Sequence, residues 1–162
     1  MFYLFTCLLD RGQFIIASPL VGDILPLSAV ADEVFASGAL GKGVAIQPSE
    51  GKVLAPANGT VSVLFPTGHA VGITTDTRVE LLIHIGLDTV NLDGRGYTSH
   101  VEKGKKVSAG DLLVEFDIAT INDAGYDTIT PVIVTNTDNF TDVLTTTEPV
   151  VARNDYLFTI VK

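Results

Sequence analysis

Several residue types are scarce in this chain of 162 residues, and each scarcity excludes a class of structure or partner. The single cysteine, Cys7, cannot form an internal disulfide, which suits a reducing compartment and predicts a cytoplasmic location. No stretch approaches the roughly 18–20 consecutive apolar residues that cross a bilayer, so we predict no membrane span. Lys and Arg number 10 against 19 Asp and Glu, giving a net charge of −9. Because nucleic acids are bound through basic side chains, this balance argues against a nucleic acid and favours a basic protein as partner.

The signatures of common enzyme classes are also missing. The glycine-rich stretch 38–43 lacks the spacing and the Ser or Thr of a Walker loop. No G-x-S-x-G, H-E-x-x-H or Cys-x-x-Cys occurs, which leaves serine hydrolase, zincin and disulfide-redox chemistry without a signature. The chain also has no acceptor lysine in the local motif of a lipoyl or biotinyl carrier. We therefore predict no cofactor and no resident metal.

Short apolar runs, in contrast, are abundant. Fifteen Gly, seven Pro and a heavy load of Val, Ile and Thr favour strands joined by turns. We predict an all-β protein with strands at 14–17, 44–46, 52–55, 60–65, 70–73, 79–85, 112–116, 132–134 and 157–161. Short helical turns are expected at 28–35, 118–124 and 139–145.

One pattern occurs twice. Residues 18–24, SPLVGDI, resemble residues 55–61, APANGTV, because each segment ends a strand at Pro and begins another after Gly. The stretch 101–113 then follows the pattern VxxGxxVxxGDxL, which resembles the barrel-sandwich hybrid of lipoyl and biotinyl carriers. We predict a duplicated barrel-sandwich hybrid in one domain, residues 14–162. Residues 1–13 are interpreted as a leader or the remnant of a linker.

Two histidines are separated by a short polar stretch that is typical of a hairpin loop. His69 precedes the apolar run 70–73, and His84 lies within the apolar run 79–85. A loop of two or four residues centred on Asp76 and Thr77 would place His69 directly opposite His84, with their Cβ atoms roughly 4.5–5.5 Å apart. A loop of odd length would break this pairing. Two facing imidazoles predict a site for proton transfer, metal capture or transfer of a group through nitrogen.

A zinc-dependent hydrolase is the weaker interpretation of these histidines. Zinc peptidases of the lysostaphin type resemble the chain at residues 97–101, but they need a His-x-His pair and a His-x-x-x-Asp pair. Gly86 follows His84 at the second position, and Ile73 follows His69 at the fourth. Both ligand pairs are therefore absent.

Taken together, the motifs resemble the glucose-type IIA domain of the bacterial phosphoenolpyruvate-dependent sugar phosphotransferase system. The resemblance rests on the segments 17–22, 32–35, 43–48, 55–60, 65–70, 79–90 and 130–136. It implies that His84 accepts a phosphoryl group from phospho-HPr and passes it to the cysteine of a IIB domain of a sugar permease. It implies further that His69 is the partner of His84, that Thr67 bonds the His69 ring, and that the Gly86 carbonyl fixes the tautomer of His84.

The same resemblance implies a docking surface around the histidines. It consists of apolar side chains with an acidic rim that meets basic groups of HPr, and rim charges chiefly raise association rates. The expected members are Asp32, Phe35, Phe65, Val71, Ile83, Ile85 and Asp88. The alternative function is a regulator that binds transporters or metabolic enzymes according to its phosphorylation state. The sugar is not encoded here, because the acceptor and membrane domains select it.

Overall fold

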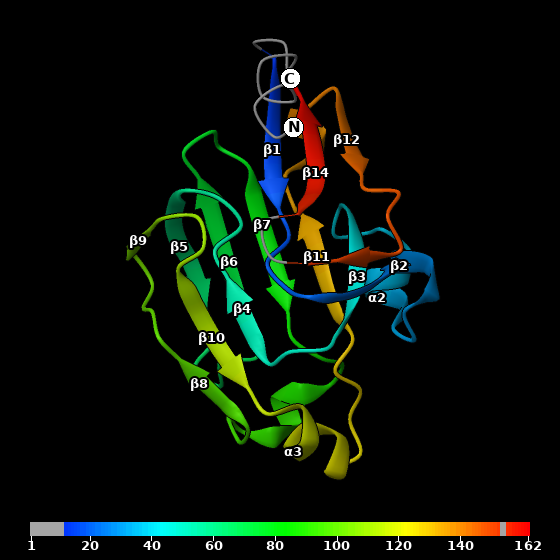
Figure 1. Cartoon of the computed structure of the whole chain (residues 1–162), viewed down its shortest axis with the longest axis vertical. Helices are drawn as coiled ribbons and strands as arrows, with labels where there is room; N and C mark the ends of the chain where they lie inside the picture. The colour runs from blue at the N-terminus through cyan, green and yellow to red at the C-terminus, as the bar shows by residue number, and fades with distance from the viewer. Residues whose placement is uncertain (1–11, 153–154) are drawn as a thin grey trace.

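The computed structural model describes residues 12–152 and 155–162, and within them most of the regular structure is β (Figure 1). The strands are β1 (Gln13–Ala17), β2 (Gly22–Pro26), β3 (Lys42–Pro48), β4 (Lys52–Leu54), β5 (Gly59–Leu64), β6 (Ala70–Thr75), β7 (Glu80–His84), β8 (Tyr97–Ser99), β9 (Lys106–Val107), β10 (Leu112–Phe116), β11 (Thr130–Val134), β12 (Asp142–Thr145), β13 (Val150–Val151) and β14 (Tyr156–Val161). The helical pieces are η1 (Leu27–Ala29), α2 (Glu33–Ala36), η2 (Thr89–Leu92), α3 (Ile118–Asp123) and η3 (Thr137–Asn139).

The described strands form one large sheet and two small ones, all of them open. The large sheet has eight strands in the order β13-β2-β3-β11-β7-β6-β5-β9, and the small sheets have the orders β1-β14-β12 and β4-β10-β8. Every pairing is antiparallel. In Figure 1, α3 lies at the opposite end of the molecule from β1 and β14. The prediction of an all-β fold with a few short helical turns is confirmed.

The core lies on both faces of the large sheet. Strands β6 and β11 are buried along almost their whole length, which explains their nearly continuous apolar sequences. One apolar cluster fills the space between the large sheet and the two small sheets. A second, smaller cluster joins Leu27, Val30 and Phe35 to Ala45 and Ile133 on the central strands. This second cluster fixes η1 and α2 against the sheet.

The two repeated segments lie side by side. The Ala17 N–H donates to the Pro56 carbonyl at 3.0 Å, and the Leu54 N–H donates to the Pro19 carbonyl at 2.9 Å. Each strand-Pro-turn unit therefore bonds to the other in the same way. This reciprocal pairing supports the duplication predicted from the two sequences.

One predicted helical turn is wrong. Residues 139–145 were expected to be helical, but β12 occupies Asp142–Thr145 and pairs with β14. Val143 is buried in the core while Leu144 is 47% exposed, which is the alternation of a strand at a sheet edge. The β-branched residues of this stretch favour that extended state, and pairing with β14 stabilises it.

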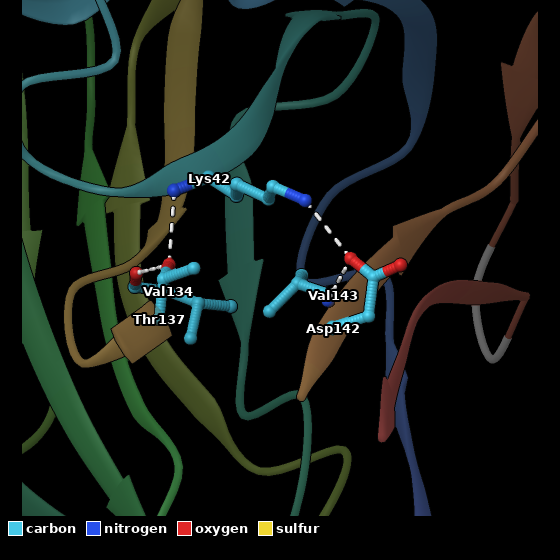
Figure 2. A network of polar contacts seen from close by, with 5 residues as sticks. All are labelled: Lys42, Val134, Thr137, Asp142 and Val143. Carbon is cyan, nitrogen blue, oxygen red and sulfur yellow. Dashed lines mark hydrogen bonds and ion pairs between the residues drawn. The ribbon is translucent and has the colours of Figure 1, made fainter. Parts of the chain in front are cut away.

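A polar network joins the small sheet containing β12 to the large sheet (Figure 2). Lys42 Nζ donates to Asp142 Oδ1 at 2.9 Å, and the Val143 N–H donates to the same oxygen at 2.8 Å. The Lys42 N–H donates to Thr137 Oγ1, whose hydroxyl donates to the Val134 carbonyl. The hydrogen bond from Lys42 lowers the pKa of Asp142. The network thus connects β3, β11, η3 and β12.

Most of the predicted leader, residues 1–13, lies outside the described residues, and Cys7 lies there too. Gln13 is already the first residue of β1, and the Lys162 N–H donates to the Gly12 carbonyl at 2.7 Å. Among the described residues, no helix is long and apolar enough to cross a membrane.

Candidate functional site

His84 is the last residue of β7, and its ring orientation is fixed by the backbone that follows it. Its Nδ1 lies 2.8 Å from the Gly86 carbonyl oxygen. Because a carbonyl only accepts hydrogen bonds, Nδ1 carries the proton and Nε2 keeps a free lone pair. The side chain is half-buried, so Nε2 belongs to a ring that is held by the protein and still reaches the surface.

Gly86 is required at its position for two reasons. Its φ of +84° is in the left-handed region, which only glycine adopts at little cost. A Cβ there would lie 2.5 Å from Thr89 Cγ2 and 2.8 Å from the Asp127 carbonyl oxygen. The glycine therefore lets the chain turn sharply after β7, and this turn aims its carbonyl back at His84.

His69 lies in the turn just before β6. It is only 2% exposed, and Thr67 Oγ1 lies 2.5 Å from its Nδ1. Its ring centroid is 5.1 Å from that of His84, with an interplanar angle of 77°. The structure therefore brings together the two predicted histidines, each with the hydrogen-bond partner that the resemblance implied.

The register that was expected to bring them together is wrong by one residue. Ala70, not His69, is opposite His84, and the hairpin loop has three residues, 76–78, with Arg78 at a φ of +67°. An odd loop of this kind is a common hairpin connection. The two rings still meet because His69 lies outside the strand, where the bend through Gly68, at a φ of +76°, turns its side chain.

Both imidazoles are neutral at neutral pH. Burial, and to a smaller extent the nearby His84, lower the pKa of His69 from 6.5 to about 4. Burial also lowers the pKa of His84, although its bond to Gly86 and the carboxylates of Asp32 and Asp88 act in the opposite direction. Asp32 is the N-cap of α2, which carries Phe35, and Asp88 is the N-cap of η2, two residues after Gly86. A neutral His84 has the lone pair that a nucleophile needs.

Two phenylalanines flank the histidines. The Phe35 ring lies 5.0 Å from the His84 ring, and the Phe65 ring lies 5.1 Å from the His69 ring, centroid to centroid. Phe65 is 41% exposed, whereas Phe35 belongs to the buried cluster beneath α2. Phe35, predicted for the docking surface, is only 7% exposed and instead packs against His84 from the core, while Phe65 presents apolar surface beside His69.

Three other residues predicted for the docking surface also lie in the core. Val71, Ile83 and Ile85 are each 0% exposed. The resemblance placed them at the surface, but β6 is buried along almost its whole length, and Ile83 lies on the buried face of β7, opposite to the face that carries His84. Their side chains support the site from beneath and do not reach a partner.

Four further residues near the site were not predicted from the sequence. Val34 and Val90 are 55% and 52% exposed; Val34 adjoins Phe35 in α2, and Val90 lies two residues after Asp88, in η2. An apolar side chain within two residues of a predicted docking residue was the signal available for both. Thr89 and Tyr97 bond the backbone between His84 and Gly86, and nothing in the sequence indicates this contact. Within the described residues, no group of three or more His, Cys, Asp or Glu side chains could hold a metal ion.

Comparisons with known proteins agree on one family. The family model for the phosphoenolpyruvate-dependent sugar phosphotransferase system, EIIA 1, matches residues 14–140. A glucose-specific EIIA component of Oceanobacillus iheyensis is 44% identical over 150 residues, which cover 91% of each chain. The solved structure of glucose permease IIA from Mycoplasma capricolum matches with a TM-score of 0.85 and 37% identity, covering 91% of this chain and 95% of that one.

Longer relatives match as well. A β-glucoside-specific EIIBCA component of Halalkalibacterium halodurans is 52% identical over 147 residues, which are 91% of this chain. The match covers 23% of that relative, so this chain spans about a quarter of its length. The family match, the full-length relative and the solved structure all cover the hairpin that carries His69 and His84. The chain therefore belongs to the EIIA 1 family of the phosphoenolpyruvate-dependent sugar phosphotransferase system.

Proposed function

We propose that His84 is the residue that accepts and releases the phosphoryl group. The observation that carries this proposal is the bond from His84 Nδ1 to the Gly86 carbonyl, which leaves Nε2 as a free nucleophile. As a member of its family, the chain is a phosphotransferase of sugar uptake, which takes the phosphoryl group from HPr and delivers it to a IIB domain.

In the first step, His84 Nε2 attacks the phosphorus of phospho-HPr. The new Nε2–P bond forms as the N–P bond of the donor breaks, and the electron pair returns to the donor's ring nitrogen. His84 keeps its proton on Nδ1, so the phosphorylated ring carries a positive charge. The Gly86 carbonyl accepts from this proton and so stabilises the ring's charge.

In the second step, the cysteine thiolate of the IIB domain attacks the same phosphorus. An S–P bond forms, the Nε2–P bond breaks, and the neutral imidazole is restored. Little covalent work falls on the protein in such transfers, so positioning and charge stabilisation supply the catalysis.

His69 stabilises the phosphoryl oxygens mainly in the second step, when the group is passed on to the IIB domain. We assign the Thr67 hydroxyl as the donor to His69 Nδ1, which leaves the proton of the neutral His69 ring on Nε2. That N–H is then available to a phosphoryl oxygen on the adjacent His84. Because the pKa of His69 is about 4, the ring would act as a neutral donor at neutral pH.

The partners dock on the exposed and half-buried residues that surround the histidines, which we call the docking rim. It consists of Asp32, Val34, Phe65, Asp88 and Val90. Docking on this partly apolar surface excludes the water that would hydrolyse phosphohistidine. The two carboxylates favour a basic partner surface, in keeping with the net charge of −9.

The acceptor is a IIB domain of the β-glucoside type. This part of the proposal is supported by the identity of 52–55% to three β-glucoside-specific EIIBCA components, against 44% to the glucose-specific EIIA component. A faster discharge to a β-glucoside IIB domain than to a glucose IIB domain would support it, and equal rates would refute it. The single cysteine fits a reducing environment, which supports a cytoplasmic location for the transfer.

The proposal is tested by following phosphoryl transfer and its position. The protein is incubated with phosphoenolpyruvate, Enzyme I and HPr, and intact mass should show the gain of one phosphoryl group. Nitrogen NMR of the labelled product should place the group on Nε2 of His84. A phosphoryl group on Nδ1, or on another residue, would overturn the assignment. Addition of the IIB domain should then discharge the group, whereas a purely regulatory protein would stay phosphorylated.

A further inference from the structure

Ile85 lies between His84 and Gly86, and both of its backbone polar groups are bonded. Its N–H donates to the His69 carbonyl at 2.6 Å. Its carbonyl oxygen accepts two hydrogen bonds, from Thr89 Oγ1 at 2.7 Å and from the Tyr97 hydroxyl at 2.8 Å. A buried carbonyl with both lone pairs occupied by side-chain hydroxyls is held more firmly than one with a single partner.

The Ile85 carbonyl controls the direction of the Gly86 carbonyl. The two carbonyls are separated by one peptide plane and by the φ and ψ of Gly86, a residue with no Cβ to limit rotation. Fixing the Ile85 oxygen fixes this plane, and the φ of +84° at Gly86 then aims its own oxygen at His84 Nδ1. A rotated plane would take away the partner that keeps the proton on Nδ1.

Tyr97 also contacts the segment that carries the other histidine. A Cβ at Gly68 would lie 3.2 Å from Tyr97 Cβ, so the tyrosine lies directly against the turn that precedes His69. Its ring stacks on Phe116, with the centroids 6.5 Å apart and an interplanar angle of 29°. Burial raises the pKa of Tyr97, so its hydroxyl stays protonated and can donate. Tyr97 therefore contacts both the turn before His69 and the backbone after His84.

We propose that Thr89 and Tyr97 are positioning residues for phosphoryl transfer, which hold the Ile85–Gly86 peptide so that His84 presents Nε2 as its nucleophile. Neither side chain touches the phosphoryl group. The inference rests on the proposed role of His84. Thr89 comes from η2 and Tyr97 from β8, so two separate elements converge on one carbonyl.

The test combines Thr89→Val and Tyr97→Phe, which remove each hydroxyl while keeping the shape of the side chain. Each single variant should slow phosphate gain from phospho-HPr by a factor of about 2 to 10, the effect of one net hydrogen bond. The double variant should lose more than either single variant. Its His84 ring should show nitrogen shifts of mixed tautomers, whereas the wild-type ring should be protonated on Nδ1 alone. Thr89→Ser, which keeps a hydroxyl at this position, should retain the wild-type rate of phosphate gain and the wild-type His84 tautomer.

The matched control is Thr75→Val, which removes a buried threonine hydroxyl at the far end of the same hairpin. It should lower stability without changing the His84 tautomer. The inference is overturned if the double variant keeps the pure Nδ1–H tautomer and the wild-type rate, or if Thr75→Val shifts the tautomer equally. Failure of the proposed function is a separate result, because the wild-type protein itself would then not be phosphorylated on His84.

Discussion

The two histidine segments differ in almost every local property, although their rings lie 5.1 Å apart. His69 comes from a turn, is 2% exposed, and is bonded by the side chain of Thr67. His84 comes from a strand end, is half-buried, and is bonded by the backbone of Gly86. The carboxylates of Asp32 and Asp88 raise the pKa of His84 against the effect of its burial, whereas burial is the main influence on the pKa of His69.

Under the proposed function, this difference gives two identical side chains different roles in one reaction. A ring near the surface with a backbone-fixed tautomer is suited to form and break a bond to phosphorus. A buried ring with a strongly lowered pKa is suited to donate one hydrogen bond without changing its charge. The environment, and not the residue type, therefore assigns the roles.

Replacing His84 or His69 by glutamine should separate the role of the nucleophile from that of the hydrogen-bond donor. This is the largest effect we expect. His84→Gln should gain no phosphoryl group at all, because the nucleophilic nitrogen is gone. His69→Gln should still be labelled by phospho-HPr, but its discharge to a IIB cysteine should slow by about 10²- to 10³-fold, the effect of losing one preorganised donor. Rapid-quench measurement of each half-reaction provides the test. Equal defects in both half-reactions of His69→Gln would contradict the division.

The sequence predicted the pair of histidines better than it predicted the reason they meet. Apolar runs identify the hairpin strands, but nothing in residues 76–78 shows that Arg78 adopts a φ of +67° and gives the loop an odd length. The rings meet only because the turn before β6 redirects His69. Local composition indicates strands well, whereas register depends on backbone angles that residue type does not determine.

Other features could not be predicted from the sequence because they too depend on tertiary contacts. The strands β8, β9 and β13 have two or three residues each, so pairing defines them and no periodic pattern could. An apolar run also does not reveal which of its residues face the core, so nothing in the run 79–85 shows that Ile83 is buried while His84 is half-buried. The Thr89 and Tyr97 hydroxyls converge on Ile85 from separate elements, and a single sequence carries no signal of that convergence.

Replacing Gly68, before His69, or Gly86, after His84, by alanine should show which of the two turns has the more constrained backbone. Gly68→Ala meets mainly the mobile Ser99 hydroxyl at 3.0 Å and Tyr97 Cβ at 3.2 Å, so it should lose about 1–2 kcal/mol to its left-handed backbone. Gly86→Ala adds the clash with the Asp127 carbonyl oxygen at 2.8 Å and should lose about 2–5 kcal/mol. Urea unfolding measures both losses.

Gly104→Ala is the matched control for these variants. Gly104 has a φ of +92° with nothing within 4 Å of an added Cβ, so only the backbone cost remains. Gly86→Ala should therefore be less stable than Gly104→Ala, with Gly68→Ala close to the control. If all three variants had the same stability, the turn after His84 would not be specially constrained.

The lowered pKa of His69 should make the folded protein sensitive to acid. His69 titrates at about 4 in the fold and at 6.5 when unfolded, so below pH 6.5 the unfolded chain binds more protons. The stability linked to this ring is fully present above pH 6.5 and is lost as the pH falls towards 4. The loss amounts to about 3 kcal/mol, and it levels off below that pH. The lowered pKa of His84 acts in the same direction.

Urea unfolding at pH 7.5 and pH 4.5 compares the wild type with His69→Gln. The glutamine variant lacks this titration, so its stability should fall less between the two conditions. Each protein serves as its own reference at pH 7.5, which removes the effect of the substitution on packing. An equal fall in both proteins would show that His69 is not held neutral by its burial.

The smallest effect expected concerns the acidic part of the docking rim, which should influence the encounter with HPr and not the chemistry. Asn replaces Asp well at both positions: Asp32 caps α2 by accepting from the Val34 N–H at 2.9 Å, and Asn caps equally well. Asp88 has a φ of +57°, which Asn also tolerates. The double Asn variant should slow second-order phosphate gain from phospho-HPr by about 3- to 10-fold at low salt and flatten its salt dependence.

Screening limits the reach of exposed charges to about 10 Å at 0.1 M salt, so the wild-type rate should fall towards that of the variant as salt rises. Reaction of His84 with a small phosphoryl donor, measured at pH 8 where the ring is neutral in both proteins, should change little. Asp138→Asn with Glu102→Gln, two exposed acids outside the docking rim, is the control with the same change in net charge and should leave the HPr rate near that of the wild type. If the control slowed the reaction as much as the rim variant, overall charge and not the rim would guide HPr. If reactivity towards the small donor fell in parallel with the HPr rate, the carboxylates would act on the nucleophile itself, and the contrast between the two histidines would include their charge environment in catalysis as well as in docking.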